Sequence, residues 1–154
     1  MKTHIDDEAD ARTFCRPENF DCVLMLASAF GYFENPEENR QLLLNAHRSL
    51  KKNGVLVLKM VGKELTDRLL FTHWNPIKKE KDGWIVLEER KVAQNWERIE
   101  FHITMHKGDR RFKRVLTHEL YSAKELLTIV TGCGFDSINI YGNYQGDPYD
   151  HLAE

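Results

Sequence analysis

A strand-helix-strand unit in residues 20–58 constrains the fold of this chain more than any other segment. Residues 21–26 form a short apolar run without polar alternation, which predicts a strand covered on both faces, as in a parallel sheet. After Asn35-Pro36 come apolar residues at helical spacing, with acidic residues in the first turn and two lysines near the end. Asn53-Gly54 predicts the helix stop, and residues 55–58 the next buried strand. We therefore expect two parallel strands joined by a helix.

Three later segments have strand character: residues 84–92, 96–106 and 111–121. The middle segment alternates, with polar and charged side chains on one face and apolar side chains on the other. We expect these segments to form an antiparallel meander before the last helix. That helix should begin at Ser122, where Glu125 three residues later completes a capping box.

Two segments give weaker patterns. Residues 4–9 resemble the end of a strand that stops at Asp10, and their acidic run indicates an edge or frayed strand. Residues 62–76 carry leucines at helical spacing and predict a short helix that ends at the proline. Because no repeat, low-complexity tract or linker interrupts the sequence, we expect one domain, residues 1–154, with the meander inserted as residues 84–121.

Composition excludes several function classes. A length of 154 residues with 42% apolar content fits one globular domain, and a net charge of -2 argues against a nucleic-acid surface. No apolar run is long enough for a membrane span, and three widely spaced cysteines suit a reduced cytoplasm. His102, His106 and His118 lie on neighbouring predicted strands, but their spacing does not indicate a metal site. We expect a cytoplasmic protein without metal, membrane or nucleic-acid partners.

Several short motifs together carry a family resemblance over nearly the whole chain. They are Asp10-Ala11-Arg12, Asn19-Phe20-Asp21, Phe30-Gly31-Tyr32-Phe33, the predicted helix and turn at 39–54, Tyr121 to Leu127, Gly134-Phe135, Tyr141-Gly142 and residues 146–150. In combination these residues resemble the C-terminal part of class I S-adenosylmethionine (SAM)-dependent methyltransferases. The resemblance implies a Rossmann-like α/β sheet, truncated at the N-terminus, into which the antiparallel meander is inserted.

The resemblance also implies SAM as cofactor and a set of residues that contact it. Asp10 would accept a hydrogen bond from the adenine amino group, and the backbone of Ala11 would contact the ring. Leu26 and Ala27 end the strand whose backbone passes beside the sulfonium and ribose in this family. The alternatives are a solvated surface acid at Asp10 and an ordinary strand end at Ala27.

Aromatic residues border the same edge of the predicted sheet. Because methyl transfer needs a dry site, we interpret Phe30 and Tyr32 as substrate-pocket residues, with a place in the core as the alternative for Phe30. Arg90 and Trp96 on the meander could line the same pocket, with a solvated strand face as the alternative. The sequence identifies no catalytic residue, because direct displacement at a sulfonium requires no protein nucleophile.

Two features of the family are absent from this sequence. No glycine-rich turn follows an early strand, and no acidic residue follows a second one. The chain also stops at Glu154, where similar proteins continue into a further strand, so both ends look truncated. We therefore expect the isolated chain to be inactive unless another chain completes it, and to form homo- or hetero-oligomers through exposed sheet edges.

Two functional interpretations remain. The first is an enzyme that transfers a methyl group from SAM to a small molecule, impaired in this short chain. The second is a non-catalytic methyltransferase remnant that pairs with another chain as a binding or regulatory partner. A third, weaker interpretation is another nucleotide-binding parallel-sheet fold, which the antiparallel meander disfavours.

Overall fold

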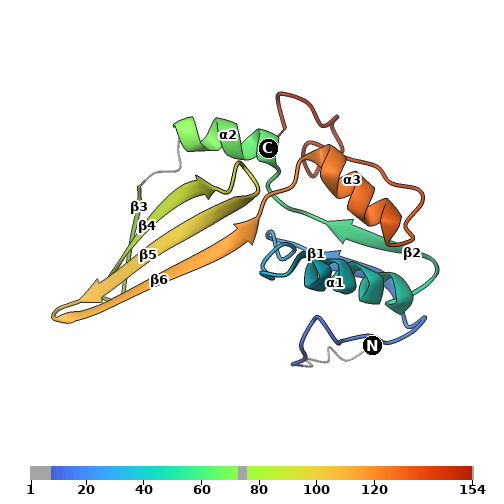
Figure 1. Ribbon diagram of the computed structural model, residues 1–154, viewed down its shortest axis with the longest axis horizontal. Coiled ribbons are helices and arrows are strands. Elements are labelled where there is room, and N and C mark those ends of the chain that lie inside the picture. The colour runs from blue at the N-terminus through green and yellow to red at the C-terminus, as the bar shows by residue number, and fades with distance from the viewer. Residues whose placement is uncertain (1–7, 73–75, 154) are drawn as a thin grey trace.

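The computed structural model describes residues 8–72 and 76–153, and it forms two sheets with three helices (Figure 1). The elements are β1 (Phe20–Met25), α1 (Pro36–Ser49), β2 (Leu50–Leu58), α2 (Lys63–Thr72), β3 (Ile77–Lys81), β4 (Trp84–Ala93), β5 (Arg98–Lys107), β6 (Arg110–Glu119) and α3 (Ala123–Gly132). β1 and β2 form a parallel pair, and β3-β4-β5-β6 form an antiparallel sheet. The mixed α/β architecture expected from the sequence is confirmed.

Helix α1 begins as the sequence predicts but ends earlier. The Asn35 side chain caps it by accepting a hydrogen bond from the Glu37 amide at 3.0 Å. The helix stops at Ser49, so the lysines expected in its last turn belong to β2. The predicted stop at Asn53-Gly54 was wrong: Asn53, with a φ of 63°, lies in β2, where the pairing with β1 shifts register.

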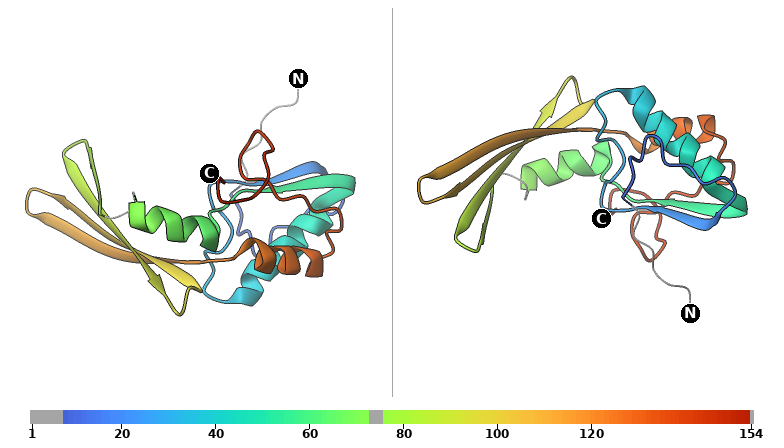
Figure 2. Two further views of the ribbon diagram at one scale, coloured as in Figure 1. Left: turned by 90° about the horizontal axis from the view of Figure 1, so that it is seen from above. Right: turned by 90° about the horizontal axis from the view of Figure 1, so that it is seen from below.

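Within the part of the chain that the structure describes, the parallel pair is covered on one face only. Val23 pairs with Leu56 and Met25 with Leu58, and these side chains pack into the hydrophobic cluster. Helices α1 and α3 contribute to that cluster and lie on the same side of the pair (Figure 2). On the opposite face Leu24 is 61% exposed. The expectation of a strand buried on both faces was therefore wrong for the described residues, because both packing helices use one side.

The core joins the parallel unit to α3 and to the loop after β1. Leu43 of α1 is fully buried at 0% exposure, and Phe30 is 1% exposed, with its ring 5.5 Å from that of Tyr121. Cys133, just after α3, belongs to the same cluster. Phe30 was expected in the substrate pocket, but the structure places its side chain in this core.

The antiparallel sheet confirms the expected meander and adds a strand. β4, β5 and β6 match the predicted segments within a few residues. In β5 both the polar and the apolar side chains are half-buried, apart from the buried Ile99 and the exposed Lys107. β3 was not expected, because Ile77–Lys81 has one apolar residue among four charged ones. It pairs with β4 at the edge of the sheet.

Three further expectations concern the start of α3, the strand expected before Asp10 and the end of α2. The capping box at Ser122 is confirmed, because its side chain accepts from the Glu125 amide and the Glu125 carboxylate accepts from the Ser122 amide. Residues 8–10 are not in a strand, and most of the strand expected at 4–9 lies outside the described residues. Helix α2 ends at Thr72, and the residues just after it also lie outside them.

Candidate functional site

A cavity of about 220 Å³ lies where the carboxyl end of β1 meets α2 and the antiparallel sheet. Its lining residues are Ala27, Ser28, Tyr32, Val61, Thr66, Arg90, Ile99, Phe101, His118 and Leu120. They come from six of the nine elements or from the loops that follow them. Ligands in open parallel sheets bind beyond the carboxyl ends of the strands, which is where this cavity lies.

The turn after β1 brings backbone to one wall of the cavity. Ala27 and Ser28 have φ values of 53° and 57°, a left-handed conformation that non-glycine residues seldom adopt. The Ser28 amide donates to the Lys59 carbonyl at 3.0 Å, and the Val61 amide approaches the Ser28 hydroxyl at 3.3 Å. The turn is thereby tied to the segment that follows β2, and its small side chains leave the cavity open.

His118 joins this turn to the antiparallel sheet. Its side chain is almost completely buried, and Nε2–H donates to the Ser28 carbonyl at 3.1 Å. Burial lowers the pKa of His118, so the ring is neutral at pH 7. Gly31 must be glycine here, because its φ is 103° and a Cβ would lie 3.2 Å from the imidazole. The ring of Tyr32 meets that of His118 edge-on at 4.6 Å.

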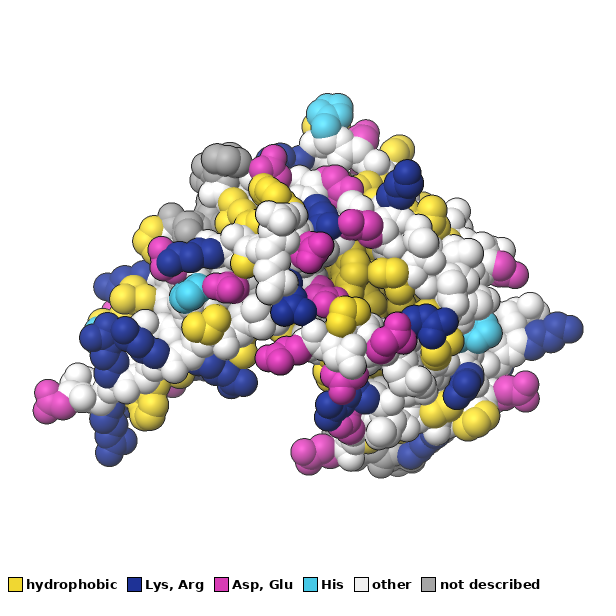
Figure 3. Space-filling view, in the orientation of Figure 1, with side chains coloured by type: hydrophobic (Ala, Val, Ile, Leu, Met, Phe, Trp, Pro, Cys, Tyr) yellow, Lys and Arg dark blue, Asp and Glu magenta, His cyan; other side chains and the backbone are white. Residues whose placement is uncertain are grey.

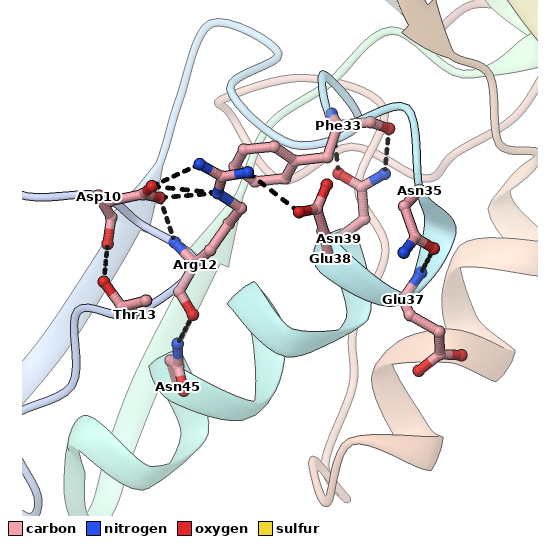
Figure 4. Close-up of polar contacts among 9 residues, drawn as sticks. All are labelled: Asp10, Arg12, Thr13, Phe33, Asn35, Glu37, Glu38, Asn39 and Asn45. Atoms are coloured by element: carbon pink, nitrogen blue, oxygen red, sulfur yellow. Dashed lines mark hydrogen bonds and ion pairs between the residues drawn. The ribbon is translucent and has the colours of Figure 1, made fainter.

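A second set of contacts anchors the loop after β1. Asn39, which is 1% exposed, donates to the Phe33 carbonyl at 3.0 Å and to the Glu119 carboxylate at 3.1 Å. Figure 4 shows the Asn39 amide turned toward the Phe33 backbone. Tyr121 donates to the same carboxylate. Burial, together with this bond, raises the pKa of Tyr121 well above its usual value. Helix α1, the loop and β6 are thus held together by one buried polar group.

Arg90 contributes a neutralised charge to the cavity. Its guanidinium forms an ion pair with Glu88 at 2.5 Å and lies 5.6 Å from the centre of the Phe101 ring. Both charged side chains are mostly buried, at 14% and 16% exposure. The cavity wall is therefore apolar with a compensated ion pair rather than a free charge.

Of the four expected pocket residues, two line the cavity. Tyr32 and Arg90 do, whereas Phe30 lies in the core and Trp96 lies in the turn between β4 and β5. The backbone of that turn is left-handed from Gln94 to Trp96. The expected segments 84–92 and 96–106 left a break between them, but Trp96 was expected in the second strand, and β5 begins only at Arg98.

Sequence reasoning missed other lining residues. Ile99 and Phe101 do lie on the apolar face predicted for β5, and His118 pairs with Ile99 across the ladder and so faces the same way. That register would have identified His118 as an inward-facing residue. Thr66 could have been placed only by knowing how α2 approaches the sheet.

The expected cofactor residues lie in two places. Ala27 lines the cavity, and Leu26 precedes it at 41% exposure. Asp10 and the exposed Ala11 are not among the lining residues; the Asp10 carboxylate binds the Arg12 guanidinium (Figure 4), which lowers the pKa of Asp10 to about 2. Arg12 also contacts Glu38 at 3.0 Å. Their roles toward SAM remain predictions.

Charge is distributed unevenly over the surface. Lysine and arginine side chains gather at the far end of the antiparallel sheet (Figure 3), where Lys107, Arg110, Arg111 and Lys113 are exposed.

Within residues 8–72 and 76–153, no group of His, Cys, Asp and Glu is arranged to hold a metal ion. His102 faces away from His118, since the two lie three ladder positions apart and an odd separation places side chains on opposite faces of the sheet. Among the described helices, none has the length and apolar character needed to cross a membrane.

No protein-family model and no curated protein matches the sequence, whereas solved structures match the fold. A SAM-dependent methyltransferase from Clostridium acetobutylicum aligns with a TM-score of 0.75 and 13% identity over 95% of this chain and 59% of its own. The CcbJ methyltransferase of Streptomyces caelestis aligns with a TM-score of 0.71 and 11% identity over 94% of this chain and 58% of its own. SAM-bound CalS10, an amino pentose methyltransferase from Micromonospora echinaspora, aligns with a TM-score of 0.59 and 19% identity over 90% of this chain and 59% of its own.

This chain therefore spans about three fifths of the length of the solved structures that it matches. The likeness extends over nearly all of the chain, including both the parallel unit and the antiparallel sheet. Over that length, the chain has the fold of class I SAM-dependent methyltransferases.

Proposed function

We propose that this chain takes part in SAM-dependent methyl transfer to a small molecule, and that the cavity is its acceptor site. The observation that carries the proposal is the cavity at the carboxyl end of β1, within a fold shared with SAM-dependent methyltransferases. Two similar structures are described as an amino pentose methyltransferase and a sugar N-methyltransferase, which supports an acceptor of modest size.

The residues present fit the cofactor in part. The small side chains of the turn at Ala27-Ser28 leave its backbone accessible to a ligand, and Leu26, Asp10 and Ala11 would complete this half of the site. Asp10 is already engaged by Arg12, so adenine would have to share its carboxylate. The sequence contains no Gly-x-Gly-x-x-Gly motif, which leaves the other half of the cofactor without its usual backbone donors.

When bound, SAM supplies an activated methyl group, and the chain's own residues hold the acceptor. Ile99, Phe101 and Leu120 give the cavity an apolar wall, which would help to desolvate an attacking atom. Tyr32 and the His118 ring border the turn where the methyl group would arrive. The protein thus contributes alignment and a dry site, which suffice for a direct displacement.

Calorimetric titration with SAM and S-adenosylhomocysteine tests this proposal, with molar mass measured by light scattering on the same sample. Loss of two or three hydrogen bonds of about 1.5 kcal/mol each would weaken a micromolar site to roughly millimolar. We expect weak binding of both ligands by the monomer. Micromolar binding by the monomer would contradict the partial site, and no binding at roughly 10 mM would contradict the cofactor proposal.

A second candidate function is that of a binding partner for another chain, favoured by the uncovered face of the parallel pair. Leu24 pairs directly with Val57, and Val55 with Cys22, so four apolar side chains form one exposed patch. A parallel sheet is normally covered on both faces. Such a partner would add strands to the edges of the pair and helices to this face.

Light scattering distinguishes this candidate. If the patch mediates association, the wild-type chain forms dimers or larger species, and Leu24→Lys yields a monomer with unchanged circular dichroism. Lys52→Glu, an exposed substitution on β2 outside the patch, serves as the control. A wild type that stays monomeric at high concentration contradicts self-association through this face, and the patch then requires a different chain.

We also propose the cytoplasm as the compartment. All three cysteines are free in the structure, including the exposed Cys22. An exposed thiol persists in a reducing environment. Fractionation of the source cells with an antibody to the chain would test this, and recovery from the secreted fraction would contradict it.

A further inference from the structure

One polar group in the cavity wall has no partner. Thr66, on the first turns of α2, is 0% exposed, and its hydroxyl Oγ1 makes no hydrogen bond with any described residue. Its amide is satisfied by the Gly62 carbonyl at 2.9 Å, so only the side chain is unpaired. A buried hydroxyl without a partner is rare and destabilising.

The other buried polar side chains of the cavity have partners, and Tyr32 is 48% exposed, so water can serve its hydroxyl. The Arg90 guanidinium is bound by Glu88, the His118 Nε2–H is bound by the Ser28 carbonyl, and the Ser28 hydroxyl is approached by the Val61 amide. Thr66 is therefore the fully buried lining side chain whose hydroxyl has no partner among the described residues. Because it is 0% exposed, a ligand reaches this hydroxyl by displacing a neighbouring side chain.

Cavity size and charge restrict that ligand further. A volume of about 220 Å³ is below the roughly 300–1,000 Å³ of sites for drug-sized molecules, which fits a single ring. The only ionised lining group is paired, and the imidazole is neutral at pH 7, so no free charge favours a charged ligand. Ile99 and Phe101 offer apolar contact to the body of the ring.

We propose that Thr66 is the specificity-determining contact of this cavity, which binds an uncharged, single-ring molecule through one hydroxyl or amino group on the ring. The inference rests on the proposed function in one respect: it takes this molecule to be the methyl acceptor. The hydroxyl of Thr66 then acts as an anchor that fixes the ring in one orientation beside the turn after β1.

A matched pair of probes tests the contact. Phenol and fluorobenzene have similar size and shape, and only phenol carries a hydroxyl. We expect the wild-type chain to bind phenol about 2- to 15-fold more tightly than fluorobenzene, as measured by ligand-observed NMR, because one neutral hydrogen bond separates them.

Two variants assign the difference to Thr66. Thr66→Val removes the hydroxyl while keeping the shape, and should abolish the preference for phenol; Thr66→Ser keeps the hydroxyl and should retain the preference. Without ligand, Thr66→Val should also raise the melting temperature by about 2 °C or more, because the unpaired group is gone. An unchanged phenol preference in Thr66→Val, or a lower melting temperature, would overturn the proposal.

The probes also separate this inference from the function proposed above. Phenol selectivity that depends on Thr66, together with no response to S-adenosylhomocysteine, would support the cavity contact and refute the cofactor site. Binding of S-adenosylhomocysteine without phenol selectivity would support the cofactor site and overturn the role of Thr66.

Discussion

Asn39 holds the loop after β1 between α1 and the antiparallel sheet, so its removal should loosen the cavity wall. Its amide donates to the neutral Phe33 carbonyl at 3.0 Å and to the Glu119 carboxylate at 3.1 Å. These bonds are worth about 1 kcal/mol and about 1.5–3 kcal/mol respectively. We expect Asn39→Ala to lower the free energy of unfolding by about 2.5–4 kcal/mol, measured by urea denaturation with circular dichroism.

Asn45, on the same helix, provides the control. It is also buried, but it donates to the neutral Arg12 carbonyl at 2.8 Å and accepts from Gln41. Asn45→Ala should cost about 1–2 kcal/mol, because no charged partner is lost. Equal losses in the two variants, or a loss below about 1 kcal/mol for Asn39→Ala, would refute the claim that the bond to Glu119 anchors the loop.

Three further predictions follow from burial and charge. Burial lowers the pKa of His118, so as the pH falls the unfolded state takes up a proton on this residue before the folded state does. The free energy of unfolding should therefore fall as the pH drops through about 6.5, and His118→Gln should flatten that part of the pH–stability curve. Met25→Ala, on the covered face of β1, should cost about 2–5 kcal/mol in denaturant unfolding, whereas Leu24→Ala on the exposed face should cost far less; similar costs would mean that both faces are covered. Lys63 and the Ser122 cap lower the pKa of Glu125 to about 2, so the stability that Glu125 adds should be present above about pH 4.5 and lost toward pH 2. Glu125→Gln should remove this loss, and a variant whose stability still falls in the same way between pH 4.5 and pH 2 would contradict the prediction.

The parallel unit and the meander could be predicted from the sequence because their signals are local. Apolar runs mark β1 and β2, and strict alternation marks β5. β3 could not be predicted, since an edge strand needs little apolar content and its sequence is mostly lysine and glutamate. The end of α1 was missed because Asn53-Gly54 serves equally well as a helix stop and as a bulge in a strand.

The candidate site was harder to predict because it depends on how the elements pack. Tyr32 and Arg90 were identified from residue type, but Thr66 and His118 reach the cavity only through the approach of α2 and the register of β6. Trp96 was wrongly expected to line the cavity. It lies in a turn of three successive residues with left-handed backbone, Gln94 to Trp96, rather than in a strand. Side chains that converge from distant segments leave no periodic signal in the sequence.

Amide chemical-shift mapping by NMR tests whether the turn after β1 and the cavity beside it form the methyl-transfer site. Titration with S-adenosylhomocysteine should shift the amide signals of Ala27, Ser28 and their neighbours, and phenol added afterwards should shift those of Thr66 and Phe101. Shifts confined to other parts of the chain, such as the basic end of the antiparallel sheet, would contradict this position of the site.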